Sequence, residues 1–192
     1  ICKAGGWTGD TSLVSQAEVL KLDGSNMDGV FRKCLTAGKI PILIMEDGVL
    51  GVGGFTVLDV AFMRALAERV SEAGGRKIFD EVQALIRATQ GKGLFGFNRW
   101  ADPKNPKHLP DFITFAKGMG DGHAIAGVGG RREIIQQVKT PPRKPGNTFD
   151  TFSRLRDATT AARKVLEISQ GNSLDKNVHL RGEDLQRNLG AM

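Results

Sequence analysis

The chain has 192 residues, 25% of them charged and 40% hydrophobic, and a formal net charge of +6 at pH 7. This length predicts one large or two small domains with a sizeable core, and the composition is ordinary for a globular protein. No apolar run approaches the roughly 20 residues of a membrane span. The basic residues form no continuous run, so no nucleic-acid-binding motif is predicted.

The two cysteines, Cys2 and Cys34, lack the spacing of a metal or redox motif, which predicts free thiols in a reducing compartment. Residues 1–6 have neither the apolar core of a signal peptide nor the Arg/Ser character of a transit peptide. At the other end, residues 182–190 resemble a helix that stops soon after it starts. We therefore expect a fragment or a reduced form of a larger protein, soluble in the mitochondrial matrix or the cytoplasm.

From the N-terminus, the apolar spacing allows a short helix over 12–22 and predicts a helix over 27–37, which Gly38 ends. The continuous β-branched run over 40–45 predicts a strand buried on both faces. A glycine-rich loop over 46–54 follows this strand.

The next element is an amphipathic helix over 58–73 that Gly74 and Gly75 close; its expected core positions are Phe62, Leu66, Ala67 and Val70. A short strand over 77–79 then delivers Asp80. Further strands are predicted over 112–116 and 124–128.

A helix is predicted over 131–139, and the three prolines of 140–146 exclude helix there. The last long helix spans 151–169, with inward positions Leu155, Ala158, Ala162, Val165 and Leu166. Because strands alternate with helices, the predicted fold class is α/β, with a mostly parallel sheet and flanking helices.

In open parallel sheets, ligands bind outside the carboxyl ends of the strands. Asp80, Lys117 and the loop that Glu46 opens each follow a predicted strand, so the pattern brings an acid and an amine to one edge. A lysine can bond the aldehyde of pyridoxal phosphate, and an acid can keep its ring nitrogen protonated. Gly118, which follows Lys117, lets a planar ring lie close to the backbone.

Ordinary structural roles could also explain these residues. On pattern alone, a lysine at a strand end is most often solvated, and an aspartate there most often caps a helix or turn. Residues 91–96 match a dinucleotide fingerprint by letter, but they run into Asn98-Arg99-Trp100 and a proline-rich loop rather than a helix, so we reject that motif. The three histidines are scattered, which argues against a metal site.

From about residue 39 onward, the chain resembles the second half of the large domain of class III aminotransferases, the ornithine, GABA and alanine-glyoxylate type of fold-type I enzymes that use pyridoxal phosphate. The resemblance implies that Lys117 is the Schiff-base lysine and that Asp80 pairs with the ring nitrogen. It also implies that Gln83 contacts the ring hydroxyl. Glu46 matches the family's Glu-Pro glutamate, and Thr148 the threonine that reaches the cofactor phosphate of a neighbouring subunit.

The sequence also departs from the family pattern. Asp47 replaces the proline of the Glu-Pro pair, and residues 84–88 lack the glycines of the family's Thr-Gly-Phe-Gly-Arg segment. Residues 150–155 are bulky where the family has small residues. By this resemblance, we expect the 192 residues to hold neither the first half of the family's large domain nor its C-terminal small domain.

These features predict a lead-in segment over 1–38, an aminotransferase-like portion over 39–170 and the start of a C-terminal helical region over 171–192. The expected function is amino transfer between an amino donor and an oxo acid with pyridoxal phosphate as cofactor. The alternative is a catalytically inactive, aminotransferase-derived structural subunit of a larger, possibly mitochondrial, assembly. The expected partner is a second copy of the chain or a larger protein complex.

The first prediction concerns the state of association. A parallel sheet that lacks its first strands exposes an open edge and an apolar face, and both favour association with other protein surfaces. We therefore expect light scattering to report a species larger than one chain. A monomer with a cooperative thermal transition would contradict this expectation.

Overall fold

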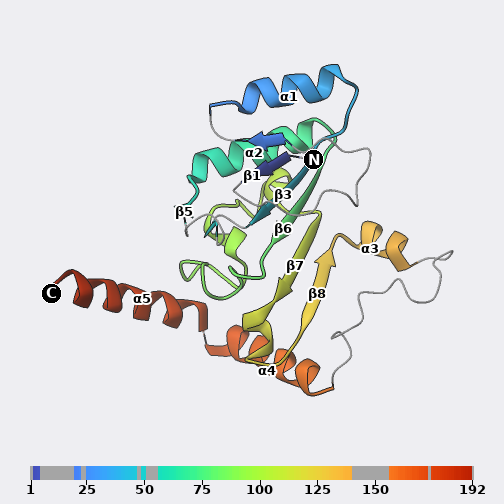
Figure 1. Ribbon diagram of the computed structural model, residues 1–192. Coiled ribbons are helices and arrows are strands. Elements are labelled where there is room, and N and C mark those ends of the chain that lie inside the picture. The colour runs from blue at the N-terminus through green and yellow to red at the C-terminus, as the bar shows by residue number, and fades with distance from the viewer. Residues whose placement is uncertain are drawn as a thin grey trace. The chain divides into compact units, whose positions relative to one another are not determined.

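The computed structural model describes residues 2–4, 20–22, 25–46, 49–50, 56–139, 156–172 and 174–191 (Figure 1). The chain divides into two compact units. Ile1–Asp80 and Trp100–Ile113 make up the first unit, and Glu81–Arg99 and Thr114–Met192 make up the second.

A parallel sheet forms the centre of the first unit. Its strands are β1 (Cys2–Ala4), β2 (Leu20–Leu22), β3 (Ile42–Glu46) and β6 (Arg76–Asp80), in the order β2-β1-β3-β6. Strand β1 pairs in parallel with β2 and with β3, and β3 pairs in parallel with β6. Strand β7 (Phe112–Ala116) follows β6 in this order and begins in the first unit. A separate antiparallel pair consists of β4 (Val49–Leu50) and β5 (Thr56–Val57). The predicted α/β class with a mostly parallel sheet is confirmed.

Helix α1 (Met27–Thr36) lies between β2 and β3 in the chain, and α2 (Val60–Glu72) lies between β3 and β6. Parallel neighbours require such crossover connections. The Asp59 carboxylate caps α2 by accepting the Phe62 N–H at 2.9 Å. The sequence placed Phe62 in the core, but it is half-buried; the neighbouring Met63 is fully buried, as expected of a residue that fills the core.

The core of the first unit gathers apolar residues of α2 and of the sheet. Its fully buried members are Leu43, Met45, Met63, Leu66, Ala67, Val70, Phe79 and Trp100. Burial of each large side chain contributes about 1.5–3 kcal/mol relative to exposure. The rings of Phe79 and Trp100 lie 5.5 Å apart between centroids and are tilted. Strand β6 therefore has one face in this core.

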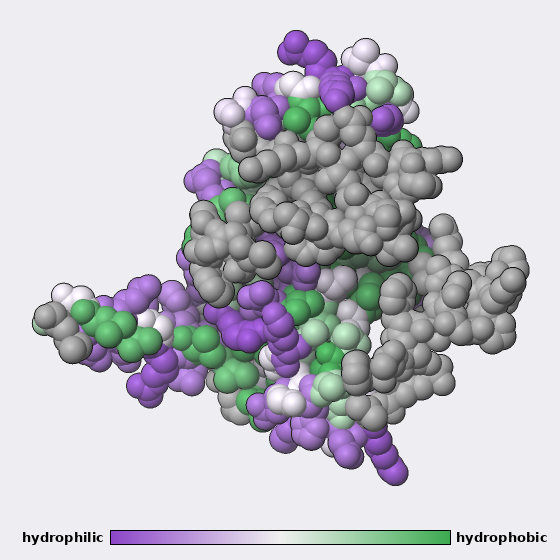
Figure 2. All heavy atoms as spheres, viewed as in Figure 1, coloured by the Kyte–Doolittle hydropathy of each residue, from purple (hydrophilic) through white to green (hydrophobic). Residues whose placement is uncertain are grey.

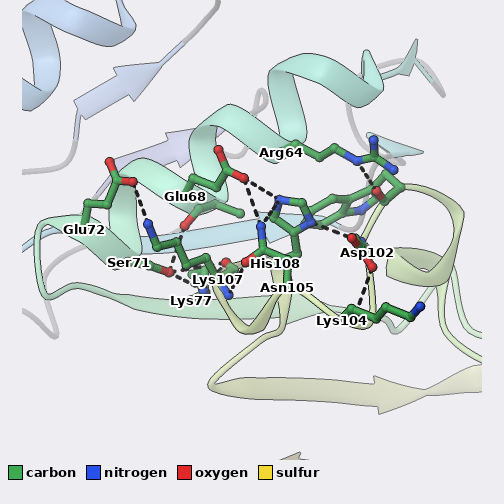
Figure 3. A network of polar contacts seen from close by, with 12 residues as sticks. Arg64, Glu68, Ser71, Glu72, Lys77, Asp102, Lys104, Asn105, Lys107 and His108 are labelled. Carbon is green, nitrogen blue, oxygen red and sulfur yellow. Dashed lines mark hydrogen bonds and ion pairs between the residues drawn. The ribbon is translucent and has the colours of Figure 1, made fainter.

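A polar network fastens the segment between Trp100 and Asp111 to α2 (Figure 3). Arg64 Nε donates to the Trp100 carbonyl at 2.7 Å. The buried His108 accepts the Asp102 N–H at its Nδ1 atom at 3.0 Å, and its Nε2 lies 2.9 Å from Glu68 Oε1. Because Nδ1 accepts, Nε2 carries the proton in the neutral ring and donates it to Glu68.

Two lysines belong to the same network. The buried Lys77 amine donates to Ser71 Oγ at 2.5 Å and also to the Lys107 carbonyl. On the surface, the Lys107 amine lies 2.8 Å from Glu72 Oε1. This hydrogen bond and the charge of Lys107 lower the pKa of the Glu72 carboxyl, and those of Glu72 raise the pKa of the Lys107 amine.

The second unit begins with the compact turns of Glu81–Arg99 and continues with the end of β7 and with β8 (Ala126–Gly130). Its helices are α3 (Arg132–Lys139), α4 (Arg156–Asn172) and α5 (Leu174–Gly190). Helix α4 packs against the turn after β7 and buries Ala158 and Ala162, which lie one turn apart. Asp175 of α5 accepts the Gly93 N–H at 3.0 Å.

Helix α5 has no buried residue among those described, and apolar side chains line one of its faces (Figure 2). Its exposed leucines are Leu180, Leu185 and Leu189. The sequence predicted only a short helix from Gly182, and this prediction is wrong because α5 begins at Leu174. A glycine within a helix costs only about 1 kcal/mol relative to alanine, so Gly182 does not interrupt α5.

Most other predicted elements are confirmed within one to three residues, since α1, β3, α2, β6, β7 and α3 occur where the pattern placed them, and α4 ends three residues beyond its predicted end. Strand β3 is fully buried on one face and half-buried on the other, rather than buried on both. Strand β8 lies two residues beyond its predicted position. Leu20–Leu22 form β2, so the helix over 12–22 is wrong there, because pairing with β1 decides the structure of this stretch. Residues 11–19, 140–146 and 151–155 lie outside the described residues.

None of the helices within the described part of the chain is both long and apolar enough to cross a membrane. The segment boundaries predicted at residues 38 and 170 remain a prediction.

The turn between α2 and β6 generates the second prediction. A Cβ on the buried Gly75 would lie 2.4 Å from the Pro41 carbonyl oxygen and 2.8 Å from that of Val70, whereas a Cβ on Gly74 would meet nothing within 4 Å. Gly75→Ala should therefore lower the free energy of unfolding by about 3 kcal/mol, at the upper end of overpacking costs. The matched control Gly74→Ala should cost about 1 kcal/mol, because its φ is +70°. Urea unfolding measures both, and equal losses would contradict the packing argument.

Candidate active site

Two predicted site residues end neighbouring strands of the first unit. Glu46 is the last residue of β3 and Asp80 the last residue of β6, and the parallel register makes them direct partners. Paired strands lie about 4.8 Å apart, so the two carboxyl groups share one edge of the sheet. Both residues are half-buried. This edge is where ligands bind in open α/β sheets.

Lys117 belongs to the second unit and follows β7 directly, as the sequence predicted. It opens a short 3-10 helix over Lys117–Gly120, its side chain is exposed, and its φ is +44°. A positive φ is uncommon for a residue with a side chain, and such strain tends to gather at functional positions. The strand end therefore presents the Lys117 amine from a backbone that the surrounding structure must hold in place.

The glycines after Lys117 serve different purposes. A Cβ on Gly120 would lie 2.7 Å from Ile125 Cγ2, so this position needs a glycine for packing inside the second unit. Gly122 has a φ of +89°, which glycine adopts without strain. Beside Gly118 lies the guanidinium of Arg87, with Cζ 3.6 Å from where a Cβ would stand.

Gln83 lies half-buried in the turn after β6, and the buried Glu81 organises that turn. The Glu81 carboxylate accepts the Gly96 N–H at 2.7 Å and the Phe97 N–H at 3.1 Å. The Glu81 N–H donates to the Thr114 carbonyl of β7 at 2.9 Å. Glu81 thus joins the Gln83 turn, the Gly96 loop and the strand that leads to Lys117.

One residue that organises this region, Glu81, did not emerge from the sequence. An acid next to Asp80 is a visible signal, but only the fold shows that it is buried. Thr148, the predicted phosphate contact, lies outside the described residues. Within the described ranges, no group of three or more His, Cys, Asp or Glu residues is placed to hold a metal ion.

The donor set suits pyridoxal phosphate by its chemistry. An exposed amine on a fixed backbone can hold an aldehyde carbon, and a carboxylate at a strand end can hold a protonated pyridine nitrogen. The structure brings Glu46 and Asp80 together at one edge of the sheet in the first unit, whereas Gln83 and Lys117 belong to the second unit.

The family model for class-III aminotransferases matches residues 30–192, most of the chain. The chain therefore belongs to the class III aminotransferase family, as its resemblance implied. The family uses pyridoxal phosphate.

The sequences of curated aminotransferases are similar to this chain over almost its whole length. A 5-aminovalerate aminotransferase of Pseudomonas aeruginosa is 30% identical over 98% of the chain and 38% of its own length. A 4-aminobutyrate aminotransferase of Escherichia coli is 29% identical over 100% of the chain and 39% of its own length. The chain thus spans about two fifths of the length of these relatives.

Solved structures support the fold. An S-selective transaminase from an Arthrobacter species matches 100% of the chain and 49% of its own chain, with a TM-score of 0.75 at 20% identity. The ornithine δ-aminotransferase of Plasmodium falciparum matches 98% of the chain and 44% of its own, with a TM-score of 0.71 at 19% identity. The fold is therefore part of a fold-type I aminotransferase structure.

The third prediction tests Glu81 as the organiser of its turn. Glu81→Gln places an NH₂ group against one of the two backbone N–H groups of Gly96 and Phe97, so a buried donor loses its acceptor. Such a loss costs about 1–3 kcal/mol. Thermal unfolding should show this cost, and hydrogen exchange of the Gly96 or Phe97 amide should accelerate. The control Glu133→Gln, at an exposed pair with Arg131, should change stability by less than about 0.5 kcal/mol. Unchanged exchange at both amides would contradict the assignment.

Proposed function

We propose that this protein transfers an amino group between an amino donor and an oxo acid with pyridoxal phosphate, and that Lys117 carries the reaction. The observation that supports the proposal is the position of Lys117, directly after β7 on a backbone with positive φ, in a member of the class III aminotransferases. Pyridoxal phosphate, when bound, supplies an electron sink for the carbon that bears the amino group.

The residues divide the work by their chemistry. Lys117 Nζ would hold the aldehyde carbon of the cofactor and later carry the proton that leaves the amino-bearing carbon. The Asp80 carboxylate would keep a proton on the ring nitrogen, and Gln83 would hydrogen-bond the ring hydroxyl. Glu46, the register partner of Asp80, would add a second acid at the same edge. For Thr148 we propose contact with the cofactor phosphate of a second copy.

The donor class follows from the relatives. Two of them are named for 5-aminovalerate and 4-aminobutyrate, which carry their amine at the end opposite the carboxylate. We propose donors of this kind for the present chain. We also keep the proposal that it works as a homodimer or within a larger complex, in the mitochondrial matrix or the cytoplasm.

The departures from the family pattern, above all Asp47 and residues 84–88, sustain the alternative of a catalytically inactive structural subunit. In the second unit, however, the turn that contains residues 84–88 is compact, and Ala84, Leu85 and Ile86 are buried. The residues that depart from the family pattern therefore form a packed turn, which removes one argument for the structural subunit.

The fourth prediction tests the role of Lys117. Incubation with pyridoxal phosphate and reduction with borohydride should leave a phosphopyridoxyl group on Lys117, which peptide mass spectrometry locates. Lys117→Ala should abolish the label, and Lys164→Ala, at an exposed lysine of α4, should retain it. A label on another lysine, or none at excess cofactor, would sink the catalytic interpretation and favour the structural subunit.

The same preparation tests Asp80. Asp80→Asn removes the charge that stabilises a protonated ring nitrogen, so cofactor labelling should persist while amino transfer falls by at least about 100-fold, an effect equivalent to about 2.7 kcal/mol. Amino transfer equal to that of the unchanged protein would refute the role of Asp80.

A further inference from the structure

One buried histidine fastens residues 101–110, the His108 loop, to the first unit. The structure describes this whole stretch, and within it His108 alone is buried, while its other residues are half-buried or exposed. The two ends of the loop are held separately. Trp100, which precedes it, is fully buried, and Asp111, which follows it, accepts the Lys77 N–H of β6 at 2.9 Å. The loop can therefore leave α2 by a local opening while the core stays folded.

The His108 ring uses both of its nitrogens (Figure 3). Its Nδ1 accepts the Asp102 N–H of the loop at 3.0 Å, and its Nε2 lies 2.9 Å from Glu68 Oε1 on α2. The Asn105 amide donates to the same Glu68 oxygen at 3.1 Å. A neutral imidazole has one acceptor and one donor. The arrangement therefore matches a single protonation state, the neutral ring with its proton on Nε2.

A second proton on the ring conflicts with this arrangement. It would sit on Nδ1 and point at the Asp102 N–H, so two donors would face each other at 3.0 Å and the hydrogen bond would be lost. An imidazolium in this buried place also gives up its hydration. In a released loop both groups meet water. Protons therefore bind more readily to the released loop, and by linkage acid favours release.

The charged groups around His108 leave this direction unchanged. They come from α2, β6 and the loop itself, and they are Arg64, Glu68, Glu72, Lys77, Asp102, Lys104 and Lys107. Glu68 contacts the ring and favours the imidazolium, but its side chain is 41% exposed, and water weakens an ion pair of this kind. Lys77 adds a positive charge on the β6 side, which opposes a second one on the ring.

The other bonds of the loop are ones that water can replace. The Lys107 amine pairs with Glu72 at 2.8 Å on the surface, and an exposed pair contributes little to stability. The Lys107 carbonyl accepts hydrogen bonds from the Lys77 amine and from Ser71. When the loop leaves, water reaches these groups and takes over their hydrogen bonds. His108 is thus the contact that decides whether the loop stays on α2.

We propose that the His108 loop is a pH-sensitive strap, which lies on α2 while His108 is neutral and leaves α2 when the ring takes up a proton. Histidine is the side chain that ordinarily changes its charge between about pH 5 and 8, so the strap responds within this range. The device is independent of amino transfer, because every residue that it uses lies in the first unit, away from Lys117.

NMR of the full chain tests the protonation step. At about pH 8 the ¹⁵N shifts of the His108 ring should show a bare Nδ1 and a protonated Nε2, and at about pH 5 two protonated nitrogens. The protection factor of the Asp102 amide, which corrects exchange for the intrinsic effect of pH, should fall at least about 5-fold between these conditions. The α1 amide of Val30, bonded to the Asn26 carbonyl, is the internal control and should change by less than about 2-fold. A proton on Nδ1 at pH 8, or an unchanged protection factor at Asp102, would overturn the proposal.

A soluble paramagnetic agent tests release itself. It should broaden the ring signal of His108 strongly at pH 5 and little at pH 8, because the residue is 4% exposed while the loop is closed. The exposed His123 should broaden at both values and serves as the reference. A His108 ring that is protonated at pH 5 and still shielded from the agent would contradict the strap.

His108→Asn separates the charge from the hydrogen bond. The Asn Oδ1 atom can accept the Asp102 N–H at every pH, so the fall in protection should shrink to less than about 2-fold. The matched control His179→Asn, at the histidine of α5 that pairs with Glu183, should keep the full fall. Equal falls in the two variants would show that another group drives the opening and would refute the role of His108. Where His108→Asn fails to fold, the two measurements on the unchanged protein decide the proposal.

Discussion

Parallel pairing of strands is the constraint on which the candidate site depends. Parallel strands all end at the same edge of the sheet, so the register of β3 with β6 makes Glu46 and Asp80 neighbours although 34 positions separate them in the chain. The crossover helix α2 makes that pairing possible, and its buried face of Met63, Leu66 and Val70 stabilises it. In the first unit, the parallel pairing of β3 with β6 therefore determines both how the core packs and where the two carboxyl groups lie.

The second unit places its functional groups by a different means, because the turns of residues 81–99 lack repetitive structure. There the hydrogen bonds of Glu81 take the place of regular strand pairing. Its buried carboxylate accepts the N–H groups of Gly96 and Phe97, and its own N–H donates to the Thr114 carbonyl of β7. A buried charge is tolerated only when it is hydrogen-bonded in this way. Ile86, which lies between Glu81 and Gly96 in the sequence, and Lys117, which follows β7, both have positive φ values, and the rigidity of this arrangement can sustain their strain.

The sequence predicted those elements in which the spacing of the apolar residues indicates which positions are buried. The apolar spacing located α2, and the short apolar runs before Asp80 and Lys117 located β6, β7 and their ends, so the strand-end positions of Asp80 and Lys117 were visible in advance. The organising role of Glu81 was not visible, because it depends on Gly96 and Phe97, residues that local patterns do not connect with it. Strand β2 and the full length of α5 were missed because pairing with β1 and a tolerated Gly182 decide them. The cofactor role itself came from family resemblance rather than from the pattern.

Residues 84–88 lack the glycines of the family pattern, yet their backbone is tightly turned. Glycine adopts positive φ without cost, whereas a residue with a side chain pays about 1–2 kcal/mol. Ile86 accepts that cost at φ +66°, and burial of Leu85 and Ile86, at about 1.5–3 kcal/mol each, is large enough to offset it. With side chains in place of glycines, the stability of this turn depends less on the conformational freedom of the backbone and more on the packing of buried side chains. The packed turn in this way holds the backbone of Arg87 in one place, with its guanidinium beside Gly118.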